Sequence, residues 1–234
     1  MKKQVFMWLS IAMFLAFIVW TILVKTVDVW EVGYNGTKLG FYNINYQFGN
    51  LATEFGKFES LGFISDILLY ISLGYTAVLV VVGVIQWIKL KSLRKVNKIF
   101  FFLAGAYVAI VLIYGFFELV VVNYSPDSTR EVLRASYPST HVFVGGSLFL
   151  LNSYVLLKFL TIKLDSFKTM IHLSTVVLSL LLVLTRMLAC KHWLTDIIAS
   201  VILTLAIYFL FIGLCRWLIP NEVKEEQMVD PVEE

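Results

Sequence analysis

Six long apolar runs dominate this sequence and leave little freedom in the choice of fold. They cover approximately residues 5–24, 64–88, 99–122, 142–162, 169–188 and 193–219. Each is close to or above the ~20 residues that an α-helix needs to cross the hydrocarbon of a bilayer. The chain is 59% apolar and 15% charged, whereas a soluble domain averages about 45–50% apolar and about 25% charged. The sequence therefore predicts an all-α, polytopic membrane bundle of six transmembrane helices.

The segments outside the runs define the expected domain organisation. We expect one membrane domain over residues 1–218 and an acidic cytoplasmic tail over residues 219–234. The first run lacks a small-residue cleavage site before Lys25, which favours an uncleaved helix over a signal peptide. Residues 26–62 form a long, aromatic outer loop. Aromatic rings favour the membrane interface, so we interpret this segment as an interfacial loop, with a flap over a lipid substrate as the alternative.

The distribution of basic residues predicts the orientation of the bundle. Lysine and arginine in short loops mark the cytoplasmic side. With six spans, most of them fall on one side: Lys2, Lys3, five basic residues between Lys89 and Lys98, Lys158, Lys163, Lys168, Arg216 and Lys224. Both termini are then cytoplasmic, and the segments 123–141 and 186–192 both face outward. The polar residues that could form a site therefore share one membrane face.

The segment between the last two runs carries Arg186, His192 and Asp196. Such residues are costly at the edge of hydrocarbon and often mark function. If a helix begins near His192, Asp196 lies on the same helical face and its carboxylate can hold one imidazole nitrogen. Structural roles as caps or interface residues are the alternative for each residue taken singly.

The segment before the fourth run reads Pro138-Ser139-Thr140-His141. Amides at the start of a helix bind phosphate, helped by the helix dipole. Ser139 can cap this helix or donate its hydroxyl to phosphate. Arg186 can offer a planar fork to two phosphate oxygens. Together these groups predict a phosphate site at the membrane surface.

These two stretches resemble motifs of the type 2 phosphatidic acid phosphatase superfamily, membrane lipid-phosphate phosphatases related to vanadium haloperoxidases. The family's second motif, Pro-Ser-Gly-His, reads here as residues 138–141. Its third motif is Ser-Arg, five residues, His, three residues, Asp, and here it reads Thr185-Arg186, His192 and Asp196. The first motif, Lys, six residues, Arg-Pro, is degraded, because Glu118 stands in place of the Lys and Ser125 in place of the Arg.

The resemblance implies roles for the individual residues. His192 would be the nucleophile that becomes a phosphohistidine, with Asp196 holding its ring. His141 would protonate the leaving lipid oxygen and then activate water. Arg186 would stabilise the transferring group, with Ser139 and Thr140 as further phosphate-binding residues. Arg130 and Arg134 could replace the cations lost from the first motif, although each is also interpretable as a solvated loop residue.

The function implied is a metal-independent phosphatase of lipid phosphates or pyrophosphates, such as phosphatidate, phosphatidylglycerophosphate or polyprenyl pyrophosphate. Its site would face outward from a membrane for which the resemblance and small loops suggest a bacterial plasma membrane. We expect no metal or other cofactor, since the sequence lacks a carboxylate cluster suited to Mg²⁺ or a His/Cys set suited to Zn²⁺. The expected partners are the substrate and membrane lipids, not nucleic acid.

Three alternatives remain open from the sequence. The chain could be a catalytically weak or inactive relative that binds or carries phospholipids, because a lost transition-state donor costs several kcal/mol. It could transfer the phosphoryl group to another lipid. It could also be a helical membrane protein whose polar residues only connect the helices of the bundle.

Overall fold

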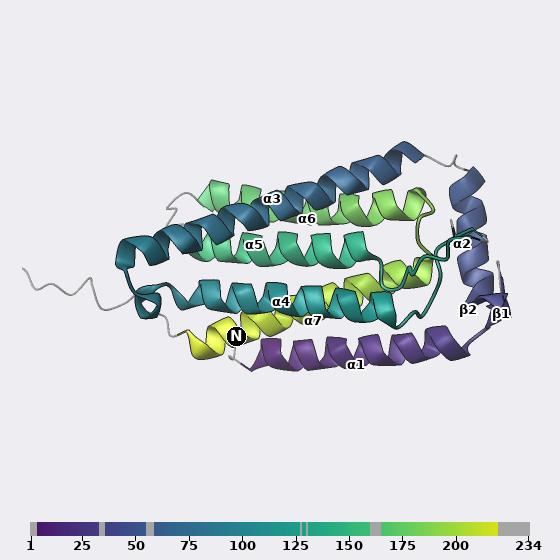
Figure 1. Ribbon diagram of the computed structural model, residues 1–234, viewed down its shortest axis with the longest axis horizontal. Coiled ribbons are helices and arrows are strands. Elements are labelled where there is room, and N and C mark those ends of the chain that lie inside the picture. The colour runs from purple at the N-terminus through teal and green to yellow at the C-terminus, as the bar shows by residue number, and fades with distance from the viewer. Residues whose placement is uncertain are drawn as a thin grey trace, which may run out of the picture.

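A bundle of long helices forms the body of the protein (Figure 1). The structure is a computed structural model and describes residues 4–32, 36–54, 59–126, 128–129, 131–159 and 165–219. Its elements in chain order are α1 (Val5–Thr26), β1 (Trp30–Glu31), β2 (Lys38–Leu39), α2 (Tyr42–Glu54), α3 (Glu59–Leu90), η2 (Leu93–Lys95), α4 (Lys98–Leu119), η3 (His141–Gly145), α5 (Gly146–Phe159), α6 (Asp165–Leu188) and α7 (Leu194–Leu218). η3 is a π-turn that continues directly into α5.

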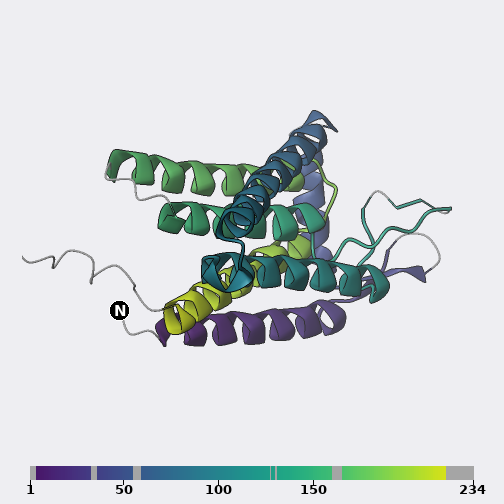
Figure 2. The same ribbon diagram turned by 60° about the vertical axis from the view of Figure 1, so that its left-hand side comes forward.

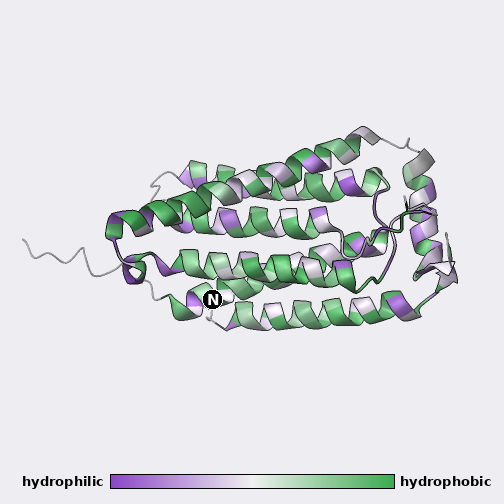
Figure 3. Cartoon of the chain, viewed as in Figure 1, coloured by the Kyte–Doolittle hydropathy of each residue, from purple (hydrophilic) through white to green (hydrophobic). Residues whose placement is uncertain are grey.

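Six of the described helices are long and apolar enough to span a membrane, which confirms the predicted number of spans. Their outer faces are largely hydrophobic (Figure 3). In the spans His141–Lys158 and Leu194–Leu218, 61% and 56% of the residues in an apolar 18-residue window are buried, against 17–22% in the other four spans. The segment η3–α5 and helix α7 are therefore the inner helices of the bundle, and the others present apolar side chains to lipid.

Helix α1 packs along α7 and supports the polar end of the bundle. Ser10 in α1 donates to the carbonyl of Ala206 in α7 at 2.9 Å. Nearer the end of α1, the rings of Phe17, Phe117 and Tyr137 pack together. Burial raises the pKa of the Tyr137 hydroxyl above its usual value, so the group stays neutral and pairs with the Thr21 hydroxyl at 2.7 Å. These contacts fix the segment that leads into η3.

The segment 26–62, predicted as an outer interfacial loop, contains a short antiparallel pair β1–β2 and the helix α2. Figures 1 and 2 show α2 lying across one end of the bundle. The fully buried Asn45 of α2 donates to the Gly40 carbonyl at 2.9 Å and to Thr195 Oγ1 at 3.1 Å. It also accepts from the Thr195 amide at 3.2 Å. Helix α2 is thus attached to the start of α7.

The start of α1 and the end of α7 lie at the end of the bundle opposite α2 (Figures 1 and 2). The segment between α4 and η3 and the turn between α6 and α7 lie at the same end as α2. The candidate residues that the structure describes in these two segments therefore share one end of the bundle. That this end faces outward, with cytoplasmic termini, remains a prediction. The predicted acidic tail from residue 220 onward lies outside the described residues.

Gly40 lies directly against the backbone at the end of α1. A Cβ atom added to Gly40 would lie 1.7 Å from the Val24 carbonyl oxygen, which belongs to the backbone. We expect Gly40→Ala to destabilise the protein by about 2–3 kcal/mol, because overpacking forces a backbone shift. The shift would also displace the Gly40 carbonyl that holds Asn45. Thermal unfolding of the purified protein in detergent measures this effect.

Gly74 of α3 provides the matched control, since a Cβ atom there would meet nothing within 4 Å. Alanine is a better helix former than glycine by about 1 kcal/mol. Gly74→Ala should therefore leave the unfolding temperature unchanged or raise it. An unchanged unfolding temperature in Gly40→Ala would show that the segment after β2 adapts freely to α1.

Candidate active site

Three helices meet in a charged cluster of Asp66, His141 and Arg186, here named the Arg186 cluster. His141 Nε2 lies 2.8 Å from Asp66 Oδ1, and Arg186 Nη2 donates to the same oxygen at 3.4 Å. The guanidinium also contacts the His141 ring. Arg186 is only 8% exposed, so solvent screens little of the interaction between its charge and these partners.

Each member of the Arg186 cluster comes from a different element. Asp66 lies in the N-terminal part of the long apolar helix α3. His141 begins the π-turn η3, a wider helical turn of the kind that recurs at functional sites. Arg186 lies in the last turn of α6, where a cation interacts favourably with the helix dipole. The cluster therefore requires the full packing of α3, η3 and α6.

A second cluster surrounds the fully buried carboxylate of Asp196 and is here named the Asp196 cluster. Asp196 accepts hydrogen bonds from Asn123 Nδ2 at 2.8 Å, from Ser136 Oγ at 2.8 Å and from the Trp193 amide at 3.1 Å. His192 Nδ1 lies 3.0 Å from the Ser136 carbonyl oxygen. Since a carbonyl only accepts, Nδ1 is the protonated nitrogen of this contact, and the lone pair of a neutral ring is on Nε2.

The structure changes how Asp196 relates to His192. Helix α7 begins at Leu194, with Trp193 as its N-cap, so His192 precedes the helix and the expectation of one shared helical face does not hold. Ser136 stands between the two residues: its carbonyl faces the His192 ring, and its hydroxyl donates to Asp196. The described geometry thus connects the carboxylate to the imidazole through Ser136.

Ser139 lies between the two clusters. Its amide donates to the Asp196 carbonyl at 3.4 Å, and its own carbonyl accepts from Ser200 at 3.1 Å. The residue is fully buried, yet its Oγ atom has no hydrogen-bond partner among the described residues. A buried hydroxyl in this state is costly, and a phosphate oxygen would satisfy it. The hydroxyl makes no side-chain cap here, because the N-cap of η3 is Thr140.

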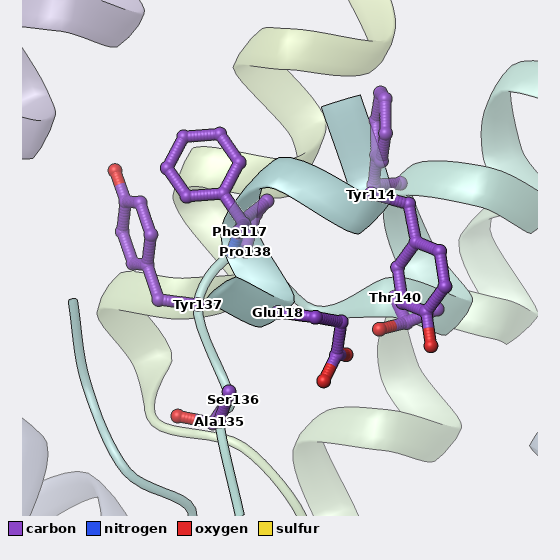
Figure 4. Close-up of a pocket in the computed structure, with 9 residues that line it drawn as sticks. Tyr114, Phe117, Glu118, Ala135, Ser136, Tyr137, Pro138 and Thr140 are labelled. Carbon is purple, nitrogen blue, oxygen red and sulfur yellow. The ribbon is translucent and has the colours of Figure 1, made fainter. Parts of the chain in front are cut away.

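The place of the degraded first motif lies against the same region. Glu118 at the end of α4 lines a small cavity together with Thr140, Ser136 and Pro138. Figure 4 shows the Glu118 and Thr140 side chains beside this cavity. A carboxylate therefore occupies the position where the family motif has a lysine. This exchange makes the surroundings of Thr140 more negative.

The other first-motif position, Ser125, has become a structural link. Its hydroxyl donates to the Lys191 carbonyl at 2.9 Å, and its amide donates to the Arg134 carbonyl at 2.9 Å. Ser125 thereby connects the outer loop to the turn between α6 and α7.

The Arg134 residue is exposed, and Arg130 lies outside the described residues. Lys191 lies nearer to the Arg186 cluster, with its Cε atom 3.8 Å from the Cβ position of Gly62, one helical turn before Asp66.

His192 also lines a cavity of about 240 Å³ beneath α2. Helix α2 supplies half of the lining residues, and the others come from the end of α6, the turn before α7 and the segment after α4. The lining residues are Asn45, Tyr46, Phe48, Gly49, Asn50, Pro126, Met187, Cys190, His192 and Trp193. This mixture of apolar and amide side chains suits the glycerol and upper acyl region of a lipid beside a phosphate.

The sequence did not single out three of these residues, Asp66, Asn123 and Ser136. An ionisable residue inside an apolar span is a functional candidate by itself, so Asp66 carried a usable signal. Asn123 and Ser136 carried none, because their contacts with Asp196 join positions 73 and 60 residues apart. Within the described residues, no group of three or more His, Cys, Asp or Glu could hold a metal ion.

The fold is a helical bundle with six candidate membrane spans among the described residues, and two polar clusters lie at one end of it. Residues 114–219 match the PAP2 superfamily. This match covers a little less than half of the chain. The chain is also similar to the crystal structure of the first transmembrane PAP2-type phosphatidylglycerolphosphate phosphatase from Bacillus subtilis, with a TM-score of 0.66 and 16% identity over 91% of this chain and 98% of that one. A search among curated proteins gave no match.

Proposed function

We propose that this protein is a metal-independent phosphatase of lipid phosphates or lipid pyrophosphates, acting at the outer membrane face through a phosphohistidine on His192. One observation carries the proposal. The Arg186 cluster and the Asp196 cluster lie at the same end of the bundle, joined by the short segment from Ser136 to His141. A phosphate bound between them would meet Arg186, Ser139 and both imidazoles.

The first step transfers the phosphoryl group to the enzyme. His192 Nε2 attacks phosphorus, and the bond from phosphorus to the lipid oxygen breaks. The contact of Nδ1 with the Ser136 carbonyl orients the ring and supports the positive charge that forms on it. Arg186 stabilises the transferring oxygens. Protonated His141 gives its proton to the leaving lipid oxygen.

The second step releases phosphate. Neutral His141 takes a proton from water, which attacks phosphorus and breaks the bond to His192 Nε2. His141 is then protonated again, and His192 is again neutral, so the cycle closes. Asp66 contacts His141 at 2.8 Å and holds the ring in place between cycles.

A catalytically silent phospholipid binder is the second candidate, favoured by specific substitutions. Glu118 and Ser125 replace two cations of the family's first motif, and Asp66 already pairs with Arg186 and His141. Each change lowers the positive potential at the site. A phosphotransferase to another lipid would use the same first step and differ only in the acceptor.

The purified protein should release phosphate in the presence of a chelator from at least one of phosphatidate, phosphatidylglycerophosphate and polyprenyl pyrophosphate. Addition of lipid alcohols to the same assay detects transfer as a new phosphorylated lipid. Saturable binding of these lipids without release or transfer would favour the silent binder. If the protein neither binds nor hydrolyses any of these lipids, both candidates are contradicted.

The role of His141 as the proton donor is tested with leaving groups of different basicity. We expect His141→Ala to slow phosphate release from a lipid substrate by about 10²–10⁴-fold, the usual contribution of general acid catalysis. With p-nitrophenyl phosphate, whose leaving group needs little protonation, the formation of the phosphoenzyme should be much less affected. Rapid-quench measurement of nitrophenol release in the first turnover separates the two steps. Equal losses with both substrates would assign His141 to binding instead.

A further inference from the structure

Asp66 contacts the two groups that a bound phosphate would need, the His141 ring and the Arg186 guanidinium. Its Oδ1 atom lies 2.8 Å from His141 Nε2 and accepts from Arg186 Nη2 at 3.4 Å. In the proposed function, the same imidazole and the same guanidinium hold the substrate. A phosphate that binds Arg186 must therefore displace the Asp66 carboxylate or lie directly beside it.

The charges around this position are closely balanced. Helix α6 contributes Arg186, η3 contributes His141, and the turn after α6 places Lys191 beside Gly62 of α3. The negative groups are Asp66 and, on the Thr140 side, Glu118. Asp196 is buried behind Ser136 with three hydrogen bonds to its carboxylate. The described part of the site thus holds about as much negative as positive charge.

We propose that Asp66 is a charge-selecting residue, which competes with phosphate for Arg186 and His141 and makes the site favour a singly charged phosphate group over a dianion. This inference rests on the phosphate site of the proposed function. The repulsion from a fixed carboxylate grows in proportion to the charge of the ligand. A phosphate monoester carries a charge of about −2 above pH 7, and a diester carries about −1. The chemical class that fits the site best is therefore a lipid phosphate monoester in its singly ionised form, for which a phosphodiester is a binding probe of the same charge.

The size of the selection follows from the exposure of the carboxylate. A fully desolvated pair of charges would give a very large effect, but 45% of the Asp66 side chain is exposed, and solvent screens its field. We expect about tenfold selection for each added negative charge. A tenfold difference between dissociation constants is large enough to measure. An electrostatic effect of this size is also small enough that the fold should survive removal of the Asp66 charge.

The test compares two short-chain lipids that differ by one methyl group, dihexanoyl phosphatidate and dihexanoyl phosphatidylmethanol. Their dissociation constants are measured at pH 8 by ³¹P NMR titration of the full chain in detergent, in a His192→Ala background that prevents turnover. With Asp66 present, phosphatidylmethanol should bind about tenfold more tightly than phosphatidate. Asp66→Asn should tighten phosphatidate about tenfold more than it tightens phosphatidylmethanol.

Two variants separate charge from structure. Asp66→Glu keeps the charge and should keep the preference for phosphatidylmethanol. Glu31→Gln removes a carboxylate from the exposed strand β1 and should change neither dissociation constant. Weaker binding of both lipids in Asp66→Asn would overturn the inference and make Asp66 an organising residue of the site.

The comparison with Asp66 present is decisive even if Asp66→Asn does not fold. Tighter binding of phosphatidate than of phosphatidylmethanol, or no saturable binding of either, would overturn the inference. Because the readout is binding alone, a protein that binds with the expected preference but releases no phosphate contradicts only the proposed phosphatase activity.

Discussion

His192→Ala is expected to abolish phosphate release, with a loss of at least about 10³-fold in kcat, because the substitution removes the proposed nucleophile. Binding of the lipid should change little, since Arg186 and Ser139 are the residues proposed to hold the phosphate. The measurement is chelator-insensitive phosphate release over a range of substrate concentrations, which separates kcat from KM.

His172 supplies the matched control for this variant. It is an exposed histidine in the first half of α6, toward the end of the bundle away from the two clusters. His172→Ala should therefore keep the activity of the unsubstituted protein. If His192→Ala retains more than about a tenth of that activity, the nucleophile is another group and the roles assigned to both clusters are wrong.

Asp196→Ala is expected to damage both stability and activity. The carboxylate is fully buried and accepts from Asn123, Ser136 and the Trp193 amide. Its loss removes an acceptor from two buried side chains, Asn123 and Ser136, and from the half-buried Trp193 amide, which corresponds to about 3 kcal/mol or more of destabilisation. Ser136 would move with it, so His192 would lose its orientation. Thermal unfolding in detergent and phosphate release at a temperature where the variant is folded measure the two effects.

Two further substitutions define how the Asp196 effect arises. Asp165→Ala removes an exposed carboxylate whose ion pair with Lys168 is solvated, and it should change stability by less than about 0.5 kcal/mol. Asp196→Asn keeps the size of the side chain and one acceptor oxygen, so it should fall between the unsubstituted protein and Asp196→Ala in stability. Full stability in Asp196→Ala would contradict the hydrogen-bond network described here.

The spans of the bundle could be predicted because length and hydropathy alone decide them. The run 5–24 became α1 (Val5–Thr26) and the run 169–188 became α6 (Asp165–Leu188), with only the ends moved. The outer segment could not be predicted to the same level. Helix α2 depends on the contact of Asn45 with Thr195, 150 residues away, and no local pattern encodes that contact.

The candidate site was predictable in its parts but not in its connections. Spacing along the chain identified His141, Arg186, His192 and Asp196, and their common end of the bundle followed from the number of spans. The partners of these residues did not follow. The sequence paired Asp196 directly with His192, whereas the structure inserts Ser136 between them. Asp66 reaches His141 across 75 positions, a contact that only the packing of α3 against η3 creates.

The central claim is that His192 carries the phosphoryl group during turnover. The most direct measurement lets the protein react with ³²P-labelled short-chain phosphatidate and then stops the reaction without acid. Peptide mapping follows under alkaline conditions that preserve phosphohistidine. We predict label on the peptide that contains His192 and no label in His192→Ala. Phosphate release without a labelled protein, or label that persists in His192→Ala, would contradict this account.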